Sequence, residues 1–433
     1  AKVTTAESRI DICLATATKL TVDGKEIARE RTSTVDNHTV YEHYSFTLKK
    51  GQRMVFEKYG SIHTSRDLEN EGLTDAEISK KAEKEVTECP GFDTLYADSA
   101  AAWKKQWDVQ DIKIDSAREW DELAVRFSMY HLIITDPRHD GRMNIGARGL
   151  QGPGYNQHAF WDTEIYMLPF FTFTDPKAAR KLLEYRYHGL PGARQKAKDL
   201  GYEGAMYPWE AAWITDGEVT PPWAQSGQFE HHITGDVTQA IFTYCTVTGD
   251  MDFMERYGYE IMFDTAKYWV SRVTYNAALD RYEILDTIGP DEHREHIDNN
   301  AFTNYIAHLN VEYAAKYYDE LQTSNPAKLA ELSERIGLEG QREKWDALLA
   351  KMYLPRENED GIVPQDDTYM VDAAKVMQHN AETGDHQTLS KQADVMVLFL
   401  LFEDRFSAEV LFLGAAMLPR FLPFPLFLLH AVR

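Results

Sequence analysis

Cysteines are few in this chain, and the signature motifs of several common active sites are absent. Only Cys13, Cys89 and Cys245 occur among 433 residues, and none belongs to a C-x-x-C pattern. This usage suggests neither a disulfide framework nor a zinc cluster, and it is typical of a reducing cytoplasm. The absence of G-x-x-x-x-G-K-S/T, G-x-G-x-x-G and G-x-S-x-G argues against a P-loop, a dinucleotide-binding turn and a serine-hydrolase elbow.

Positive charge is also scarce. The chain has 46 Lys and Arg against 69 Asp and Glu, which gives a net charge of −23. This balance argues against nucleic acids and membranes as partners, because their surfaces carry negative phosphates. Residues 1–20 include Lys2, Glu7, Arg9 and Asp11 and lack the apolar centre of a targeting segment, so we expect a cytoplasmic protein.

Strand-like patterns come first in the chain. Apolar and polar residues alternate over Arg9–Thr18, Thr39–Leu48 and Gln52–Thr64, as they do in half-buried strands. So few strands can hardly close two sheets. We therefore predict that residues 1–70 are part of an N-terminal β-sandwich domain.

Helical patterns follow. Residues 71–118 have helical spacing with opposite charges four residues apart, which predicts a helical linker. Residues 119–405 contain one apolar-faced helical segment after another without intervening strands, which predicts an all-α domain of paired helices. The predicted fold class is therefore α+β and multidomain.

The last segment, residues 406–433, is an atypical apolar tail. The chain has no acidic residue after Glu409 and ends in VLFLGAAMLPRFLPFPLFLLHAVR. Pro419 and Arg420 interrupt this run before it reaches the ~18 residues that a membrane-spanning helix needs. We interpret the tail as a truncated or frame-shifted end, with a natural core helix plus linker as the alternative.

Tryptophans and carboxylates recur in the turns of the helical region. Three segments carry them: Pro208–Trp223, Thr287–Asn304 and His158–Phe171. Each segment alone is better explained by a helix N-cap or a solvated turn. Together they describe a sugar pocket, because aromatic rings cover the apolar face of a sugar while acids bind hydroxyls and protonate a leaving oxygen.

Histidine pairs do not indicate a metal site. His231 and His232 are adjacent, and His293 and His296 lie in DEHREH, but neither pair forms an H-E-x-x-H motif. Adjacent side chains on a helix cannot both face one ion. We therefore predict no metal.

Five motifs carry a family resemblance. YNQHAFWDTEIYMLPFF, YRYHGLPGARQKAKDLGYEGAMYPWE, EHHITGDV, IGPDEHREHIDNNAFTN and KQADVMVLF resemble the central region of glycoside hydrolase family 65, over about residues 1–405. The family holds inverting disaccharide phosphorylases of the maltose, trehalose, kojibiose and nigerose type and a few hydrolases. The resemblance implies a β-sandwich, a helical linker and an (α/α)6-barrel catalytic domain. It also implies that the chain is incomplete at both ends.

The resemblance further implies roles for seven residues. Glu292, in GPDE, matches the general acid of the family. Contacts to the glucose that is transferred are implied for Trp161 and Asp162 in FWDTE and for Lys391 and Gln392 in KQADV. Trp209 and Glu210, in PWE, match the acceptor side of kojibiose-type enzymes.

The expected reaction is cleavage of an α-glucosidic bond of a disaccharide with inversion. Phosphorolysis to β-glucose 1-phosphate plus glucose is favoured, with kojibiose or nigerose preferred over maltose or trehalose. The expected partners are the disaccharide and inorganic phosphate, which is a co-substrate, so that no cofactor is needed; a homodimer stays open. The alternatives are an α-glucoside hydrolase of the same family and a catalytically silent carbohydrate-binding fragment, because the family's phosphate-binding loops have no counterpart before the divergent tail.

Overall fold

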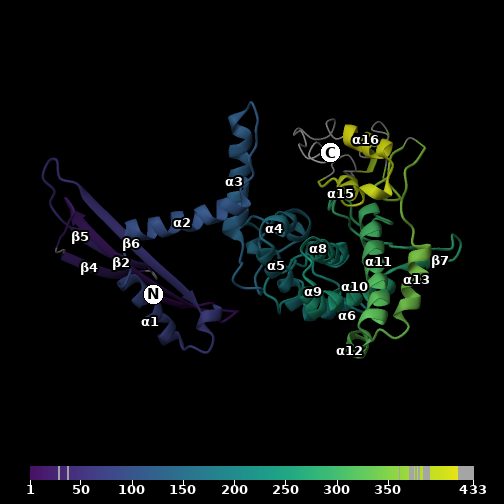
Figure 1. The fold of residues 1–433 in the computed structure, drawn as a ribbon, viewed down its shortest axis with the longest axis horizontal. Coiled ribbons are helices and arrows are strands. Elements are labelled where there is room, and N and C mark those ends of the chain that lie inside the picture. The colour runs from purple at the N-terminus through teal and green to yellow at the C-terminus, as the bar shows by residue number, and fades with distance from the viewer. Residues whose placement is uncertain are drawn as a thin grey trace. The chain divides into compact units, whose positions relative to one another are not determined.

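The computed structural model describes residues 1–27, 30–36, 39–359, 361–369, 375, 378, 381–383 and 391–417. The expectation for the apolar tail therefore lies outside the described residues from position 418 onward. The chain divides into two compact units, Ala1–Asp111 and Ile112–Arg433 (Figure 1).

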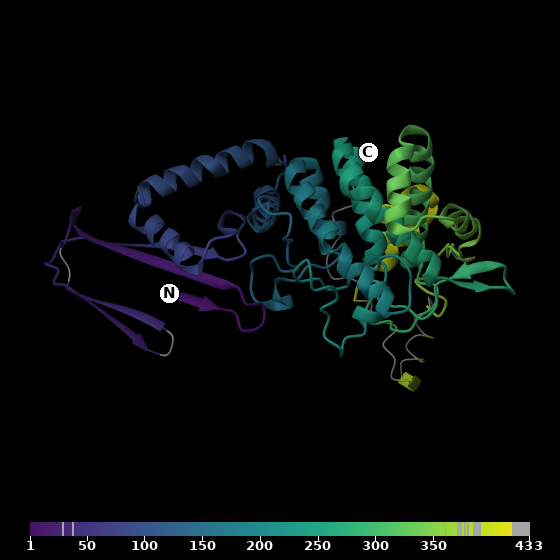
Figure 2. The ribbon, with the colours of Figure 1, turned by 90° about the horizontal axis from the view of Figure 1, so that it is seen from below.

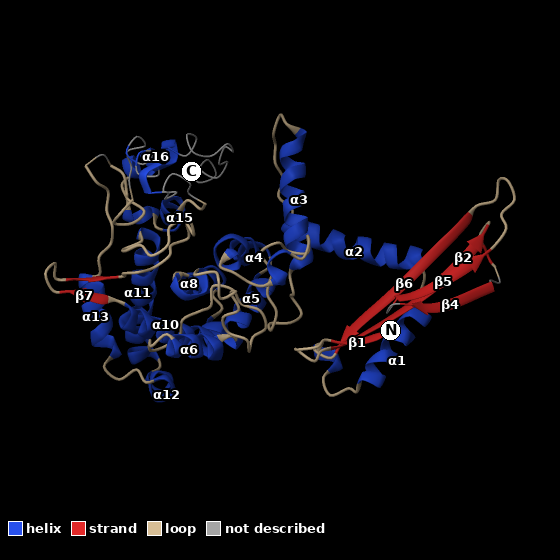
Figure 3. Ribbon diagram, turned by 180° about the vertical axis from the view of Figure 1, so that it is seen from behind, coloured by secondary structure: helices blue, strands red, loops and turns tan. Residues whose placement is uncertain are grey.

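The first unit is built on an antiparallel sheet. Its strands are β1 (Lys2–Thr4), β2 (Asp11–Val22), β3 (Lys25–Glu26) and β6 (Met54–Thr64), and β2 pairs with each of the other three. β4 (Glu30–Asp36) and β5 (Thr39–Ser45) form a separate hairpin. β2, β5 and β6 overlap the three stretches where the alternating pattern predicts strands, and β1, β3 and β4 lie outside those stretches (Figure 3).

Helix α1 (Asp75–Thr87) covers one face of that sheet. Thr74 and Glu77 begin it with a reciprocal capping box. Its residues Ala82 and Val86 are buried, and they pack with Ala15 of β2. The first unit thus contains α1 and the following helix α2 (Phe92–Gln110), which the sequence analysis assigned to a linker.

The second unit is mostly helical. Short helical turns and a hairpin of β7 (Thr274–Asn276) and β8 (Arg281–Glu283) connect the helices, and the hairpin extends away from them (Figure 2). The principal helices are α3 (Glu119–Thr135), α4 (Leu168–Thr174), α5 (Pro176–His188), α6 (Leu190–Asp199), α8 (Ile233–Thr248), α10 (Tyr259–Arg272), α11 (Ala301–Ser324), α12 (Pro326–Ile336), α13 (Gln341–Lys351), α15 (Asp394–Leu401) and α16 (Ala408–Met417).

Local sequence explains where several of these helices start. Asp175 and Asn325 cap α5 and α12, and in both cases a proline follows at the first helical position. The core between α10 and α11 includes the fully buried Trp269, whose indole Nε1 donates to Oδ1 of Asn310 at 3.0 Å. This bond joins α10 to α11, the helix that follows the loop carrying Glu292.

Candidate active site

Glu292 lies in the loop between β8 and α11. Its Oε1 forms an ion pair with Nζ of Lys391 and accepts a hydrogen bond from Nε2 of Gln392 at 3.4 Å. Glu292 and Lys391 are 99 residues apart in the sequence, and the fold joins them because Lys391 precedes α15. The Glu292 side chain keeps 23% of its surface exposed, so a ligand can reach this pair.

Asp291 fixes the two segments to each other. Its side chain is buried, and its Oδ1 accepts the backbone N–H of Lys391 at 2.8 Å. Its Oδ2 accepts a hydrogen bond from Nε2 of Gln365 at 3.1 Å. Asp291 therefore positions Lys391 beside Glu292, and its own carboxylate is occupied by these donors.

Trp161 and Asp162 approach the same place from another segment. Trp161 is buried, and Asp162 begins a single turn of π-helix, Thr163–Met167, of a kind often found at functional sites. Burial raises the pKa of Asp162, the charges of Glu164 and Glu292 raise it further, and Lys391 opposes them. Asp162 thus shares an electrostatic environment with Glu292 and Lys391.

A buried ion pair holds this segment in place. The guanidinium of Arg186 donates from Nε and Nη2 to the two carboxylate oxygens of Glu164, at 2.8 and 2.7 Å. Such a bidentate pair fixes direction as well as distance. An antiparallel bridge between Ala159 and Ala211 then places the segment beside the loop that carries Trp209.

Glu218 organises the loop around Trp209 and Glu210. Its carboxylate accepts the backbone N–H groups of Trp209 and Glu210 at 2.8 and 3.1 Å, and the hydroxyl of Thr220 at 2.7 Å. It also forms an ion pair with Lys196, whose side chain is almost completely buried. The loop therefore has a fixed shape in spite of its length.

The two predicted tryptophans meet at one histidine. The ring centroids of Trp161 and Trp209 lie 4.7 and 5.9 Å from that of His232. Glu210 is directed elsewhere, since its Oε1 pairs with Nδ1 of His158 at 2.6 Å. The structure thus brings six of the seven predicted residues into two adjoining groups, and Glu210 borders them through its loop.

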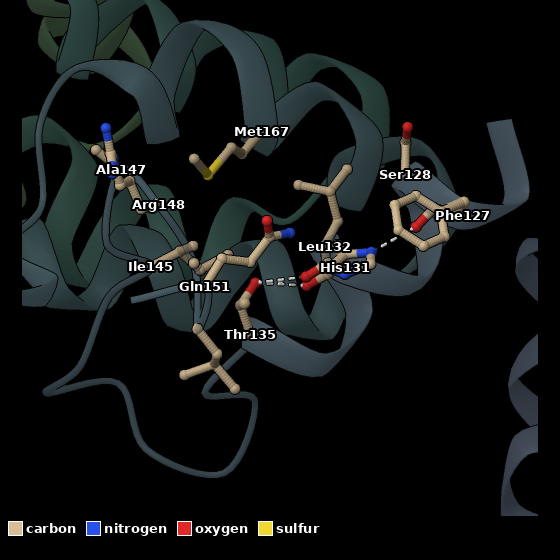
Figure 4. Close-up of a pocket in the computed structure, with 12 residues that line it drawn as sticks. Phe127, Ser128, His131, Leu132, Thr135, Ile145, Ala147, Arg148, Gln151 and Met167 are labelled. Atoms are coloured by element: carbon tan, nitrogen blue, oxygen red, sulfur yellow. Dashed lines mark hydrogen bonds between the residues drawn. The ribbon is translucent and has the colours of Figure 1, made fainter. Parts of the chain in front are cut away.

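A cavity in the described part of the second unit is lined by other residues than these. It has a volume of about 560 Å³ and is lined by α3 residues, including His131 and Thr135, by the segment 145–151 and by Met167 (Figure 4). The Thr135 hydroxyl donates to backbone carbonyls within α3. None of the seven predicted residues lines this cavity, so it does not guide the assignment of the site.

Family models match both units of the chain. The model of the glycosyl hydrolase family 65 central catalytic domain matches residues 126–412, and that of the family's N-terminal domain matches residues 1–106. The chain belongs to glycosyl hydrolase family 65. The resemblance drawn from the five motifs is confirmed.

Curated relatives of this family 65 chain are considerably longer. Kojibiose phosphorylase of Halothermothrix orenii is 38% identical over 94% of this chain and 56% of the relative. Kojibiose phosphorylase of Escherichia coli is 33% identical over 94% and 54%. Alpha,alpha-trehalose phosphorylase of Thermoanaerobacter brockii is 33% identical over 84% and 48%. The chain spans about half the length of the relatives it matches.

A solved structure supports the architecture of this family 65 chain. A protein from the human microbiome, 22% identical, covers 96% of this chain with a TM-score of 0.76, and 56% of that protein is matched. The predicted fold class, strands followed by a helical barrel domain, is confirmed.

Sequence analysis missed three buried charged residues of this family 65 site. Glu230, His232 and Asp236 are completely buried, and the histidine bonds to both carboxylates. We rejected the adjacent histidines as metal ligands without assigning them another role. The spacing of His232 and Asp236, four residues apart at a helix start, was the available signal, because such residues share one helix face.

Two further properties concern only the part of the chain that the structure describes. Within it, no three His, Cys, Asp or Glu side chains are grouped as metal ligands. Within it, too, no helix has both the length and the hydropathy to cross a membrane.

Proposed function

We propose that this family 65 chain cleaves the α-glucosidic bond of a disaccharide with inversion, using inorganic phosphate as the nucleophile. The products would be β-glucose 1-phosphate and glucose. The observation that carries the proposal is the group formed by Glu292, Lys391 and Gln392, with Asp162 in the same electrostatic environment. A site of this composition combines a proton donor with a set of hydroxyl-binding groups.

Glu292 is the proton donor in this proposal. The glycosidic oxygen is a poor leaving group. A positioned acid that protonates it typically increases the rate by ~10² to 10⁴. Lys391 and Gln392 both donate hydrogen bonds to Oε1 of Glu292. We therefore assign the transferred proton to Oε2, which would face the glycosidic oxygen. The reacting form of Glu292 carries a proton on Oε2, while Oε1 still accepts the hydrogen bonds of Lys391 and Gln392. As the C1–O bond breaks, the leaving glucose takes this proton, and Glu292 is left as the carboxylate that pairs with Lys391. A phosphate oxygen forms the new bond to C1 from the opposite face, which inverts the anomeric centre.

A second carboxylate is not required for this reaction. An inverting hydrolase needs one to activate water, whereas phosphate is already a nucleophile. Phosphate therefore enters as a co-substrate, and the proposal needs no cofactor.

A cytoplasmic location, expected from the dispersed cysteines, stays part of the proposal.

The remaining predicted residues provide recognition. Trp161 would cover the apolar face of the transferred glucose, and Asp162 would accept hydrogen bonds from its hydroxyls. Trp209 and Glu210 would contact the second sugar. The kojibiose phosphorylases among the relatives support a substrate of kojibiose type over maltose or trehalose type.

The test is sugar turnover with and without phosphate. The chain is incubated with kojibiose, nigerose, maltose or trehalose, and glucose and β-glucose 1-phosphate are measured. Glucose 1-phosphate that forms only with phosphate, and most rapidly from kojibiose, supports the proposal. Phosphate-independent glucose release would instead identify a hydrolase. Disaccharide binding without products would identify a silent carbohydrate-binding protein.

A further inference from the structure

His232 carries two ion pairs inside the second unit. Its Nδ1 lies 2.7 Å from Oδ2 of Asp236, and its Nε2 lies 3.0 Å from Oε1 of Glu230. All three side chains have no exposed surface. A neutral imidazole has one N–H donor, whereas an imidazolium has two. Two carboxylate acceptors on opposite ring nitrogens therefore match the charged form.

The surrounding charges favour the same form. Burial lowers the pKa of His232, but the carboxylates of Asp236 and Glu230 outweigh it and raise the pKa to about 10. His232 is the N-cap of α8, where the helix dipole opposes a cation. The two carboxylates compensate for that position. The cluster also interacts with acids outside it. Burial raises the pKa of Glu230, and the charge of Glu292 adds to this. Burial also raises the pKa of Asp394, whereas the charge of His232 opposes that rise.

The ring of His232 contacts both predicted sugar-binding tryptophans. It meets Trp161 and Trp209 in T-shaped contacts, with interplanar angles of 74° and 76°. A third T-shaped contact joins it to Phe302 at 5.3 Å. Because both ring nitrogens are bonded, the imidazole cannot rotate without breaking an ion pair. The two tryptophans therefore rest against a ring of fixed orientation.

We propose that His232 is a positioning residue that sets the placement of the glucose-side Trp161 relative to the acceptor-side Trp209. This inference rests on the proposed function, which assigns the two tryptophans to the two sugars. Glu230 and Asp236 act through His232 by holding its ring. A buried ionic cluster is costly to form, and a fixed geometry between two subsites is a role that accounts for it.

The first test compares two neighbouring histidines. His232→Gln cannot donate to both carboxylates in the original geometry. His231→Gln is the matched control, because His231 is also buried but bonds to the hydroxyl of Tyr268 and stacks on that ring. Misplacement of a substrate by ~1 Å costs about a hundredfold in rate. We expect His232→Gln to lower kcat/KM for kojibiose by about tenfold to a hundredfold, with kcat reduced as well, and His231→Gln to leave both constants within about twofold.

The second test uses the unsubstituted chain and no turnover. Nitrogen-15 NMR of labelled imidazoles reports whether one or both ring nitrogens carry a proton, and each variant assigns its own missing signal. At pH 8.5 we expect His232 to be doubly protonated and His231 to be neutral, since burial keeps the pKa of His231 well below its ordinary value. Adding glucose should shift the His232 signals and leave those of His231 in place.

The outcomes separate this inference from the proposed function. A chain without phosphorolysis contradicts the proposed function, whatever the His232 signals show. A neutral His232, or signals that do not respond to glucose that binds, overturns the positioning role. Equal kinetic losses in both variants would overturn it too, because they would indicate general packing. If His232→Gln does not fold, the His232 signals are assigned by through-bond correlation in the unsubstituted chain, and their response to glucose decides.

Discussion

Asp291 gives the sharpest test of how the site is assembled. Its Oδ1 accepts the backbone N–H of Lys391 and, at 3.4 Å, that of His293, and its Oδ2 accepts from Gln365. Asp291→Ala leaves the buried Gln365 amide and the partly buried N–H of Lys391 without that acceptor, whereas Asp291→Asn keeps one carbonyl oxygen. The two variants should therefore fall in a fixed order, with alanine the more damaging.

The magnitude follows from the number of donors left unpaired. Each buried donor that loses its acceptor costs about 1 to 3 kcal/mol. We expect Asp291→Ala to lower the free energy of unfolding by about 2 to 4 kcal/mol and Asp291→Asn by about 1 to 3 kcal/mol. Both should also lower kcat for phosphorolysis, because Lys391 is no longer held beside Glu292.

Urea unfolding and phosphorolysis kinetics measure these two effects. A double-mutant cycle with Gln365→Ala isolates the side-chain hydrogen bond, and contacting residues of this kind couple by about 0.5 to 3 kcal/mol. A coupling near zero, or an alanine variant as stable as wild type, would refute the conclusion that Asp291 holds Lys391 and Gln365 in place. Wild-type kcat in Asp291→Ala would show that this hydrogen bonding is not needed for catalysis.

Three other predictions concern single residues. Glu292→Gln should reduce phosphorolysis by ~10² to 10⁴ while glucose binding, measured by calorimetry, persists; more than a tenth of wild-type activity would contradict its role as the acid. Trp161→Ala should weaken glucose binding itself, whereas Trp209→Ala should chiefly change the ranking of disaccharides, and titration of each sugar distinguishes them. Burial raises the pKa of Asp394 from 3.8 to about 8. Because the folded state then holds a proton that the unfolded state has lost, the free energy of unfolding should fall between about pH 4 and pH 8. Asp394→Asn should flatten that slope in urea titrations, and an unchanged slope would assign it to other groups.

Local patterns in the sequence predicted the helices and strands better than they predicted the contacts between them. The alternation in Gln52–Thr64 became β6, and the proline after Asp175 marks the start of α5 as capping rules require. Propensity and periodicity act over a few residues, so they reach this far. They are silent on the ion pair of Glu292 with Lys391. The family resemblance assigned both residues to one site, but it did not predict that they contact each other.

The adjacent histidines show why the site was only partly predictable. In the sequence His231 and His232 are equivalent, but the structure directs one to Tyr268 and the other to Asp236 and Glu230. Neighbouring positions on a helix point in different directions. Which direction faces the site depends on the packing of α8, and a single sequence does not contain that information.

The side chain of Asn300 both caps α11 and binds a carboxylate beside the candidate site. Its Oδ1 accepts the backbone N–H of Thr303 at 2.9 Å and caps α11, and its Nδ2 donates to Oδ2 of Asp394 at 2.7 Å. An amide has its acceptor and its donor on opposite sides, so binding the helix with one directs the other toward the acid. Gly289 makes room for this arrangement, since a Cβ there would lie 2.2 Å from Nδ2 of Asn300 and 2.6 Å from Oδ2 of Asp394. The N-cap and the sugar-site interpretations of this turn therefore do not compete: the cap is what orients the polar groups next to Asp291 and Glu292.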